Sequence, residues 1–165
     1  FDGGASLVDA FPNVVMTRTF SKIHGLGGLR IGWGYARREI IDVLTRIRQP
    51  FNLSNAQLAA AEAAIRDTAW RDFCRDENLR CRAILTDALR QMGLGVDDSF
   101  TNFVLVRFAD ATQAGAADAA LKAEGIIVRR VAGYHIPEAL RITVGLEPDC
   151  RRVIATLGRF LGLGA

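Results

Sequence analysis

The order of apolar and polar residues divides the chain into alternating strands and helices. Residues 14–16 form a short apolar run that predicts a buried strand continuing to Thr19. Residues 29–36 are again rich in apolar and aromatic side chains and predict a second strand. A glycine-rich connection joins the two, so the sequence places a flexible loop directly after a strand, where many α/β proteins carry their chemistry.

Beyond residue 36, apolar side chains recur every three or four positions, which predicts several amphipathic helices separated by strands. The expected helices are residues 37–49, 56–67, 70–92, 113–124 and 149–161, and the expected strands are residues 101–108, 126–129 and 140–145. Pro50 ends the first of these helices, and Ser54 or Asn55 is a suitable N-cap for the next. This order divides the chain into residues 1–67 and residues 68–165.

Composition limits the classes of protein to consider. The chain has 165 residues, of which 50% are apolar and 24% are charged, as is typical of a globular domain. The net charge of +3 comes from scattered basic residues, so we expect no nucleic-acid partner. The apolar runs are too short for a membrane span, and we expect no membrane partner. The spacing of Cys74, Cys81 and Cys150 is not that of a metal site; we expect reduced thiols in a cytoplasmic protein and no bound metal.

The glycine-rich connection carries the strongest chemical signal. Its sequence from Thr19 to Gly32 is TFSKIHGLGGLRIG. Glycines let backbone N–H groups approach an anion, and the Thr19, Ser21 and Arg30 side chains are donors that suit a phosphate. Lys22 could be another phosphate contact, a nucleophile that forms a Schiff base with a carbonyl, or a surface lysine on a turn. The phosphate-loop motif G-x-x-x-x-G-K-[ST] is absent, so a nucleotide-binding loop is not indicated.

A second candidate site lies near the C-terminus. Arg141 stands between Leu140 and Ile142 in a predicted strand, where an unpaired guanidinium would be costly. It could form an ion pair with a protein carboxylate, or it could be a bidentate clamp for a substrate carboxylate. Arg129 and Arg130 end the preceding short strand and could be a surface pair.

The segment Arg18 to Gly32 resembles the lysine segment of fold-type I pyridoxal-phosphate aminotransferases, and within them that of the histidinol-phosphate aminotransferase family. That family's pattern is approximately R-T-F-S-K-x-x-G-L-A-G-L-R-x-G, from which this chain departs at His24 and Gly27. The resemblance implies that Lys22 is the Schiff-base lysine and also shuttles the proton, which leaves no acid–base role for His24. It also implies that Thr19, Ser21 and Arg30 hold the phosphate of pyridoxal 5'-phosphate.

The resemblance extends to the second candidate site and to the fold. The string from Leu140 to Gly145 is similar to the segment whose arginine binds the substrate α-carboxylate, which implies that role for Arg141. The arginine after the I-I-V run helps to hold the phosphate of histidinol phosphate, which implies that role for Arg129. The fold class implied is α/β: the C-terminal part of the pyridoxal-phosphate-binding large domain at residues 1–67, and the small α/β C-terminal domain at residues 68–165.

The function implied is transamination between histidinol phosphate and 2-oxoglutarate in histidine biosynthesis, by a cytoplasmic homodimer acting on small amino-acid and phosphate substrates. Threonine-phosphate decarboxylase and aromatic aminotransferases share this scaffold and remain alternatives. The resemblance covers nearly all of the chain but only the C-terminal half of the family. We therefore expect a fragment without the family's ring-nitrogen aspartate, inactive in transamination by itself; a non-catalytic truncated chain is the third alternative.

Overall fold

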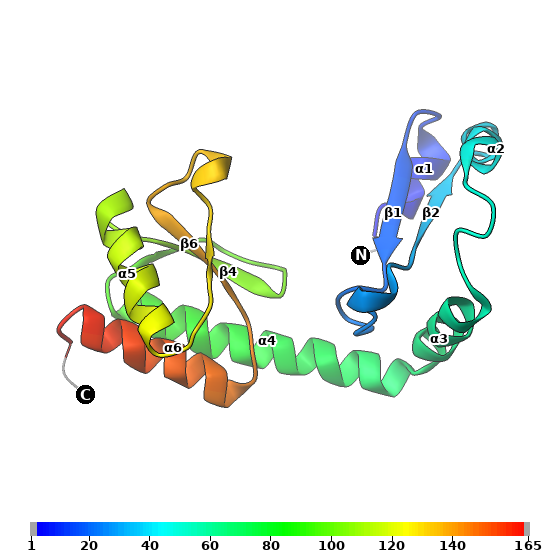
Figure 1. Ribbon diagram of the computed structural model, residues 1–165. Coiled ribbons are helices and arrows are strands. Elements are labelled where there is room, and N and C mark those ends of the chain that lie inside the picture. The colour runs from blue at the N-terminus through cyan, green and yellow to red at the C-terminus, as the bar shows by residue number, and fades with distance from the viewer. Residues whose placement is uncertain (1–2, 164–165) are drawn as a thin grey trace. The chain divides into compact units, whose positions relative to one another are not determined.

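The computed structural model describes residues 3–163 and divides the chain into two compact units, Phe1–Cys74 and Arg75–Ala165 (Figure 1). The division falls within helix α4, Thr68–Gln91, whereas the predicted boundary at residues 67 and 68 lies where that helix begins. Residues 1, 2, 164 and 165, which the predicted domains include, lie outside the described range. The assignment of the two domains stays a prediction.

The first unit is built on a two-stranded antiparallel sheet. Strand β1, Val15–Thr19, pairs with β2, Gly32–Ala36, so that Thr19 lies opposite Gly32 at the end of the ladder. Helix α1, Ala5–Ala10, contacts both strands, and α2, Arg38–Ile47, contacts β2. Helix α3, Asn55–Arg66, follows them in the chain. Ser54 is the N-cap of α3, as expected, because its hydroxyl accepts a hydrogen bond from the Gln57 backbone N–H.

Two expectations for this sheet are wrong. Four of the five β1 residues are exposed and none is buried, so β1 is not the buried strand that its apolar start indicates. The strand expected from residue 29 begins only at Gly32, because Gly27–Leu29 forms a 3₁₀ turn, η1, and Arg30 adopts a left-handed backbone conformation with φ of 54°. Most apolar side chains of α2 and α3 are likewise exposed, and neither helix contributes a buried residue.

The second unit is a four-stranded antiparallel sheet covered by helices on one face (Figure 1). The strand order is β3-β4-β6-β5, with the elements β3, Gly95–Val96, β4, Phe103–Arg107, α5, Ala111–Ala123, β5, Arg129–Arg130, η2, Ala132–Tyr134, β6, Ala139–Thr143, and α6, Glu147–Phe160. The core consists of the side chains that the helices and strands turn toward each other. It includes Leu85, Leu89, Val104, Val106, Leu121, Leu140, Ile142 and Leu157.

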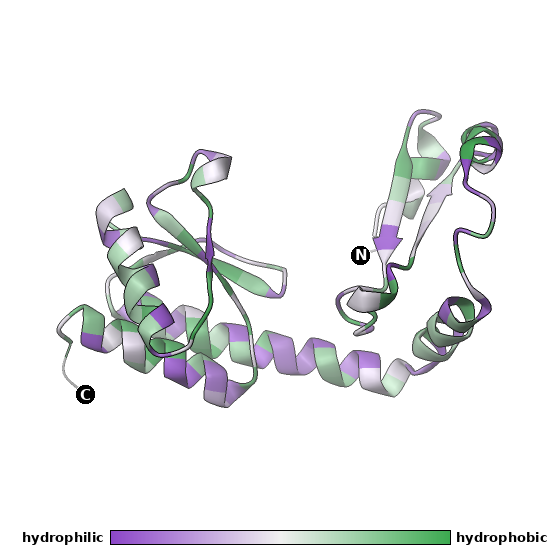
Figure 2. Cartoon of the chain, viewed as in Figure 1, coloured by the Kyte–Doolittle hydropathy of each residue, from purple (hydrophilic) through white to green (hydrophobic). Residues whose placement is uncertain are grey.

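Alternation along β4 and β6 explains why only one sheet face is covered. Val104 and Val106 are buried in the core, whereas Phe103 and Leu105 are only partly buried on the opposite face. Figure 2 shows the mixture of hydrophilic and hydrophobic residues along the long helix α4, whose buried side chains all lie in its C-terminal half. One face of this sheet therefore packs against the helices to form the core, and the other face is free to carry polar side chains.

The short edge strands differ from expectation. The strand expected at residues 126–129 is reduced to Arg129–Arg130, because the Ile126 N–H donates to the Leu121 carbonyl and closes the end of α5 instead of joining the sheet. Strand β3 was not expected, since two residues leave no alternation to detect. Pro148 lies in the first turn of α6, as its position predicts.

The three cysteines differ in burial, and this predicts their reactivity. Cys74 is partly exposed, while Cys81 and Cys150 are buried in the second unit. Burial raises the pKa of the Cys81 thiol to about 11 and also raises that of Cys150. Because the thiolate is the reactive form, we expect Ellman's reagent at pH 8 to modify Cys74 in the native chain and the other two only in guanidinium. Mass spectra that show Cys81 modified as fast as Cys74 would contradict this burial pattern.

Candidate active site

The lysine loop connects β1 to β2 and is anchored at both ends by buried apolar side chains. Phe20 and Ile31 are 7% and 5% exposed, and the Phe20 N–H donates to the Ile31 carbonyl at 3.1 Å. Inside the loop, the Leu26 N–H donates to the Phe20 carbonyl at 2.9 Å. The residues between Phe20 and Ile31 are therefore held as a closed loop at the end of a strand, the position that the sequence predicts.

Thr19, Ser21 and Lys22 lie together at the start of this loop. The Thr19 hydroxyl donates to the Ser21 hydroxyl at 2.8 Å and accepts from the Ser21 backbone N–H at 3.0 Å. This turn holds two hydroxyl groups side by side. The Lys22 side chain is exposed, and within residues 3–163 its amine forms no ion pair, unlike Lys122, which is paired with Asp118 at 2.8 Å.

Glycines bring the backbone close at two points of the loop. A Cβ atom at Gly32 would lie 2.7 Å from the Arg18 carbonyl oxygen, so no larger residue fits without a shift of the strand pair. A Cβ at Gly27 would lie 3.3 Å from the Ser21 carbonyl oxygen. Arg30 directs one guanidinium nitrogen, Nη1, to the Gly27 carbonyl at 2.9 Å, which turns its side chain back over the loop.

The left-handed backbone of Arg30 is rare for a residue with a side chain, and such conformations cluster at functional sites. The Arg30 guanidinium and the hydroxyls of Thr19 and Ser21 together present donors that suit a phosphate. His24 lies beside Phe20, with ring centroids 5.0 Å apart, and we assign it no chemical role.

Gln57 ties the loop to helix α3 and was not expected to matter. Its side-chain oxygen accepts from the Ser54 N–H at 2.6 Å, and its side-chain nitrogen donates to the Leu29 carbonyl at 2.7 Å. The sequence signal was present as the capping box from Ser54 to Gln57. The bond to Leu29, 28 residues away, depends on the tertiary fold and has no local signal.

Substitution of Gln57 tests this tie. We expect Gln57→Ala to lower the free energy of unfolding by about 1–2 kcal/mol, because it removes one half of a capping box and one bond to the loop. Gln57→Glu is the matched control, since it keeps the acceptor for Ser54 but loses the donor to Leu29. In urea titrations followed by tryptophan fluorescence, equal losses for the two variants would assign the whole effect to the loop contact.

Arg141 and Arg129 lie directly opposite each other in the pair of β6 and β5. Residues that face each other across two strands point to the same side of a sheet, so the two guanidinium groups share the face that the helices do not cover. Arg130 lies opposite Leu140 and belongs to the other face, where its guanidinium comes near Gly115 of α5. The sheet register thus separates Arg129 from Arg130, a distinction that sequence spacing alone does not make.

The environments of these two arginines are aromatic. Arg141 Cζ lies 4.9 Å from the centroid of the Phe103 ring, and Arg129 donates through Nη2 to the Tyr134 hydroxyl at 3.3 Å. Within residues 3–163 neither guanidinium forms an ion pair, and the buried Nε of Arg141 has no hydrogen-bond partner. The protein carboxylate considered as a partner of Arg141 is therefore absent from the described residues. His135, for which no role was expected, closes η2 in a left-handed conformation.

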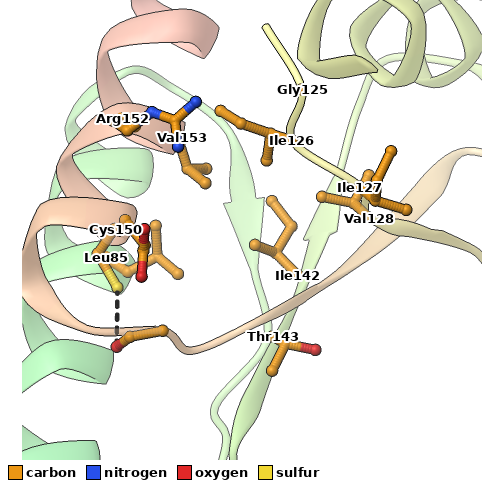
Figure 3. Close-up of a pocket in the computed structure, with 12 residues that line it drawn as sticks. Leu85, Gly125, Ile126, Ile127, Val128, Ile142, Thr143, Cys150, Arg152 and Val153 are labelled. Carbon is orange, nitrogen blue, oxygen red and sulfur yellow. Dashed lines mark hydrogen bonds between the residues drawn. The ribbon is translucent and has the colours of Figure 1, made fainter.

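A cavity of about 200 Å³ lies in the same unit but on the helix-covered side (Figure 3). Its lining includes Leu85, Ile126, Ile142 and Val153, and the Cys150 thiol at one side donates to the Gly145 carbonyl at 3.6 Å. None of the six predicted site residues lines this cavity.

The predicted site residues thus form two groups. Thr19, Ser21, Lys22 and Arg30 gather on one loop of the first unit, and Arg129 and Arg141 on one sheet face of the second. Each group presents donors and positive charge of the kind that binds an anion. The motif predicted the first group, whereas the pairing of the second required the register of the sheet.

Comparison with known proteins identifies the family. The family model for aminotransferases of class I and II matches residues 2–157, so the chain belongs to that family. It is 62% identical to histidinol-phosphate aminotransferase of Ruegeria pomeroyi over 160 residues, which is 97% of this chain and 44% of the relative. Histidinol-phosphate aminotransferase of Paracoccus denitrificans is 59% identical, with 98% of this chain and 44% of the relative covered. The chain spans less than half the length of these relatives.

Solved structures agree with this family and confirm the expected fold class. Histidinol-phosphate aminotransferase of Sinorhizobium meliloti, in complex with pyridoxal-5'-phosphate, matches with a TM-score of 0.82 and 30% identity over 92% of this chain and 42% of its own. An aminotransferase structure from Burkholderia pseudomallei matches with a TM-score of 0.84 and 32% identity over 89% of this chain and 45% of its own. The chain is therefore an α/β part of the fold-type I aminotransferase fold. None of the described helices is long and apolar enough to cross a membrane.

Proposed function

We propose that this chain is the C-terminal part of a pyridoxal-phosphate-dependent aminotransferase that exchanges the amino group between histidinol phosphate and 2-oxoglutarate in histidine biosynthesis. The observation that carries the proposal is the 62% identity over 97% of the chain to an enzyme named histidinol-phosphate aminotransferase. The family's lysine loop is present with all its chemical groups.

The donor set of the lysine loop fits pyridoxal 5'-phosphate. The paired hydroxyls of Thr19 and Ser21 and the guanidinium of Arg30 suit its phosphate, and the exposed Lys22 amine suits its aldehyde. When bound, this cofactor supplies a carbonyl that takes up the amino group and a ring that stores an electron pair.

With the cofactor bound, one side chain of this chain would transfer the proton and two others would bind the substrates. The Lys22 amine would take the proton from the substrate Cα as a general base and, as a general acid, would give it to the carbon that carried the cofactor's aldehyde. Arg141 orients the carboxylate of glutamate or 2-oxoglutarate by a bidentate contact. Arg129 orients the phosphate of histidinol phosphate from the same sheet face. Two like charges held opposite each other favour a substrate that carries an anionic group at that place.

The decarboxylase alternative has less support than the proposed transamination. Threonine-phosphate decarboxylase of Porphyromonas gingivalis matches with a TM-score of 0.79 but at 23% identity, which supports the shared fold alone.

The proposal includes a cytoplasmic homodimer. Free thiols are consistent with a reducing compartment, and exposed apolar side chains of the first unit, such as Ile47 and Phe51, are candidates for burial against other polypeptide.

A chimeric enzyme tests the proposed reaction. This chain would be fused to the part of the Ruegeria pomeroyi relative that it does not cover, and glutamate formation from histidinol phosphate would be compared with CO₂ release from threonine phosphate. We expect transamination only, lowered at least about 100-fold by Lys22→Ala. A folded chimera that released CO₂, or whose Lys22→Ala variant kept full activity, would contradict the proposal.

A further inference from the structure

The uncovered face of the second sheet holds its arginines in two different ways. Arg107 lies on this face and is satisfied by carboxylates, with Asp97 at 2.9 Å and Glu138 at 3.0 Å. Arg141, on the neighbouring strand, has no such partner within residues 3–163 and lies over the Phe103 ring. A ring face attracts a cation but brings no negative charge, so the Arg141 guanidinium stays without a compensating carboxylate among these residues, whereas that of Arg107 is compensated by two.

The sheet register explains why Phe103 is the ring that Arg141 meets. Leu105 lies directly opposite Arg141, and Phe103 lies two residues earlier on the same strand and the same face. This diagonal separation is within reach of an aromatic side chain. Phe103 is partly buried, so its ring has little freedom to leave the guanidinium.

The backbone that carries Phe103 is held by several hydrogen bonds. The Ser99 hydroxyl donates to the Phe103 carbonyl at 2.5 Å, and the Thr101 hydroxyl donates to the same carbonyl at 3.2 Å. From helix α4, Arg82 donates through Nη1 to the Thr101 carbonyl at 2.6 Å. The start of β4 is thereby fixed to the helix layer, and the position of the ring is fixed with it.

We propose that Phe103 is a positioning residue for Arg141: its ring holds the guanidinium in one orientation and leaves its charge free for an anionic ligand. The inference rests on the proposed function in one respect, namely that the ligand of Arg141 is a carboxylate. Phe103 takes no part in the chemistry itself. Its role is to hold the charged group that a carboxylate ion pair would otherwise hold and neutralise.

The test observes the Arg141 Nε–Hε group by NMR in the ¹⁵N-labelled 165-residue chain. Phe103→Leu removes the ring, Phe103→Tyr restores one, and Phe100→Leu is the matched control, because Phe100 is 93% exposed and lies three residues away. We expect Phe103→Leu to speed exchange of Hε with water and to weaken binding of L-glutamate at Arg141, each by about fivefold. Phe103→Tyr and Phe100→Leu should stay within about twofold of the parent.

The outcomes separate the positioning role from the proposed function. Unchanged Hε exchange in Phe103→Leu, or an equal change in Phe100→Leu, would overturn the positioning role. A parent chain in which glutamate leaves the Arg141 signal unmoved, while exchange still depends on the ring at residue 103, would overturn the carboxylate role and support the positioning. Unshifted amide signals of the core residues Leu121 and Leu157, which belong to helices α5 and α6, would show that the core is intact in each variant.

Discussion

Lys22→Ala is expected to abolish the covalent labelling of this chain by pyridoxal phosphate and borohydride, whereas Lys122→Ala is expected to leave that labelling intact. The chain contains only these two lysines, so the experiment has an internal control. Lys22 is exposed beside the two hydroxyls of its loop, while Lys122 is held in an ion pair with Asp118. A phosphate held by Thr19, Ser21 and Arg30 would place the aldehyde near Lys22 alone.

The measurement is the visible absorption band after addition of pyridoxal phosphate, followed by borohydride reduction and peptide mapping. We expect the label on Lys22 in the parent chain and no absorption band in Lys22→Ala. The labelling rate of the parent should exceed that of Lys22→Ala at least about 100-fold, since a bound aldehyde reacts far faster than a free one. Equal labelling of Lys22 and Lys122 would indicate unspecific reaction with exposed amines. In that case the lysine loop of this chain would not bind the cofactor.

Leu140→Ala is expected to cause a large loss of stability in the second unit. Leu140 is fully buried in β6, where it packs in the core formed by the sheet and its helices. Removing a buried leucine costs the transfer of its side chain and leaves a cavity, so we expect a loss of about 2–5 kcal/mol in the free energy of unfolding.

The matched control is Leu105→Ala on the opposite face of the same sheet, where the side chain is only partly buried. We expect this variant to lose about 1 kcal/mol, because less apolar surface is removed from water. Urea titration followed by far-ultraviolet circular dichroism measures both variants. If both lost the same amount, the assignment of one face as core and the other as ligand face would be wrong.

Local patterns in the sequence predicted the elements that depend on neighbouring residues. The lysine loop, the Ser54 cap and the helices of the second unit follow from motifs and periodicity within a few positions. The extent of β5 did not follow, because a helix end competes for Ile126. The burial of β1 did not follow either, because an apolar run indicates burial only where other elements cover it.

The candidate site divides in the same way. Thr19, Ser21, Lys22 and Arg30 could be chosen from one segment of sequence, since their spacing is itself the signal. Contacts such as Gln57 with Leu29, or Phe103 with Arg141, join residues that lie 28 and 38 positions apart. Contacts of this kind depend on strand register and helix placement, which a single sequence does not encode in any short pattern.

The direct opposition of Arg129 and Arg141 has a consequence for the unit that contains them. Like charges opposite each other on antiparallel strands repel, and the edge strand β5 has only two residues with which to hold its place. We therefore expect the second unit to be more stable with a neutral residue at position 129. If an anionic ligand binds between these two arginines, as proposed, it would relieve the repulsion, and this pair of strands would then have exchanged stability for ligand binding.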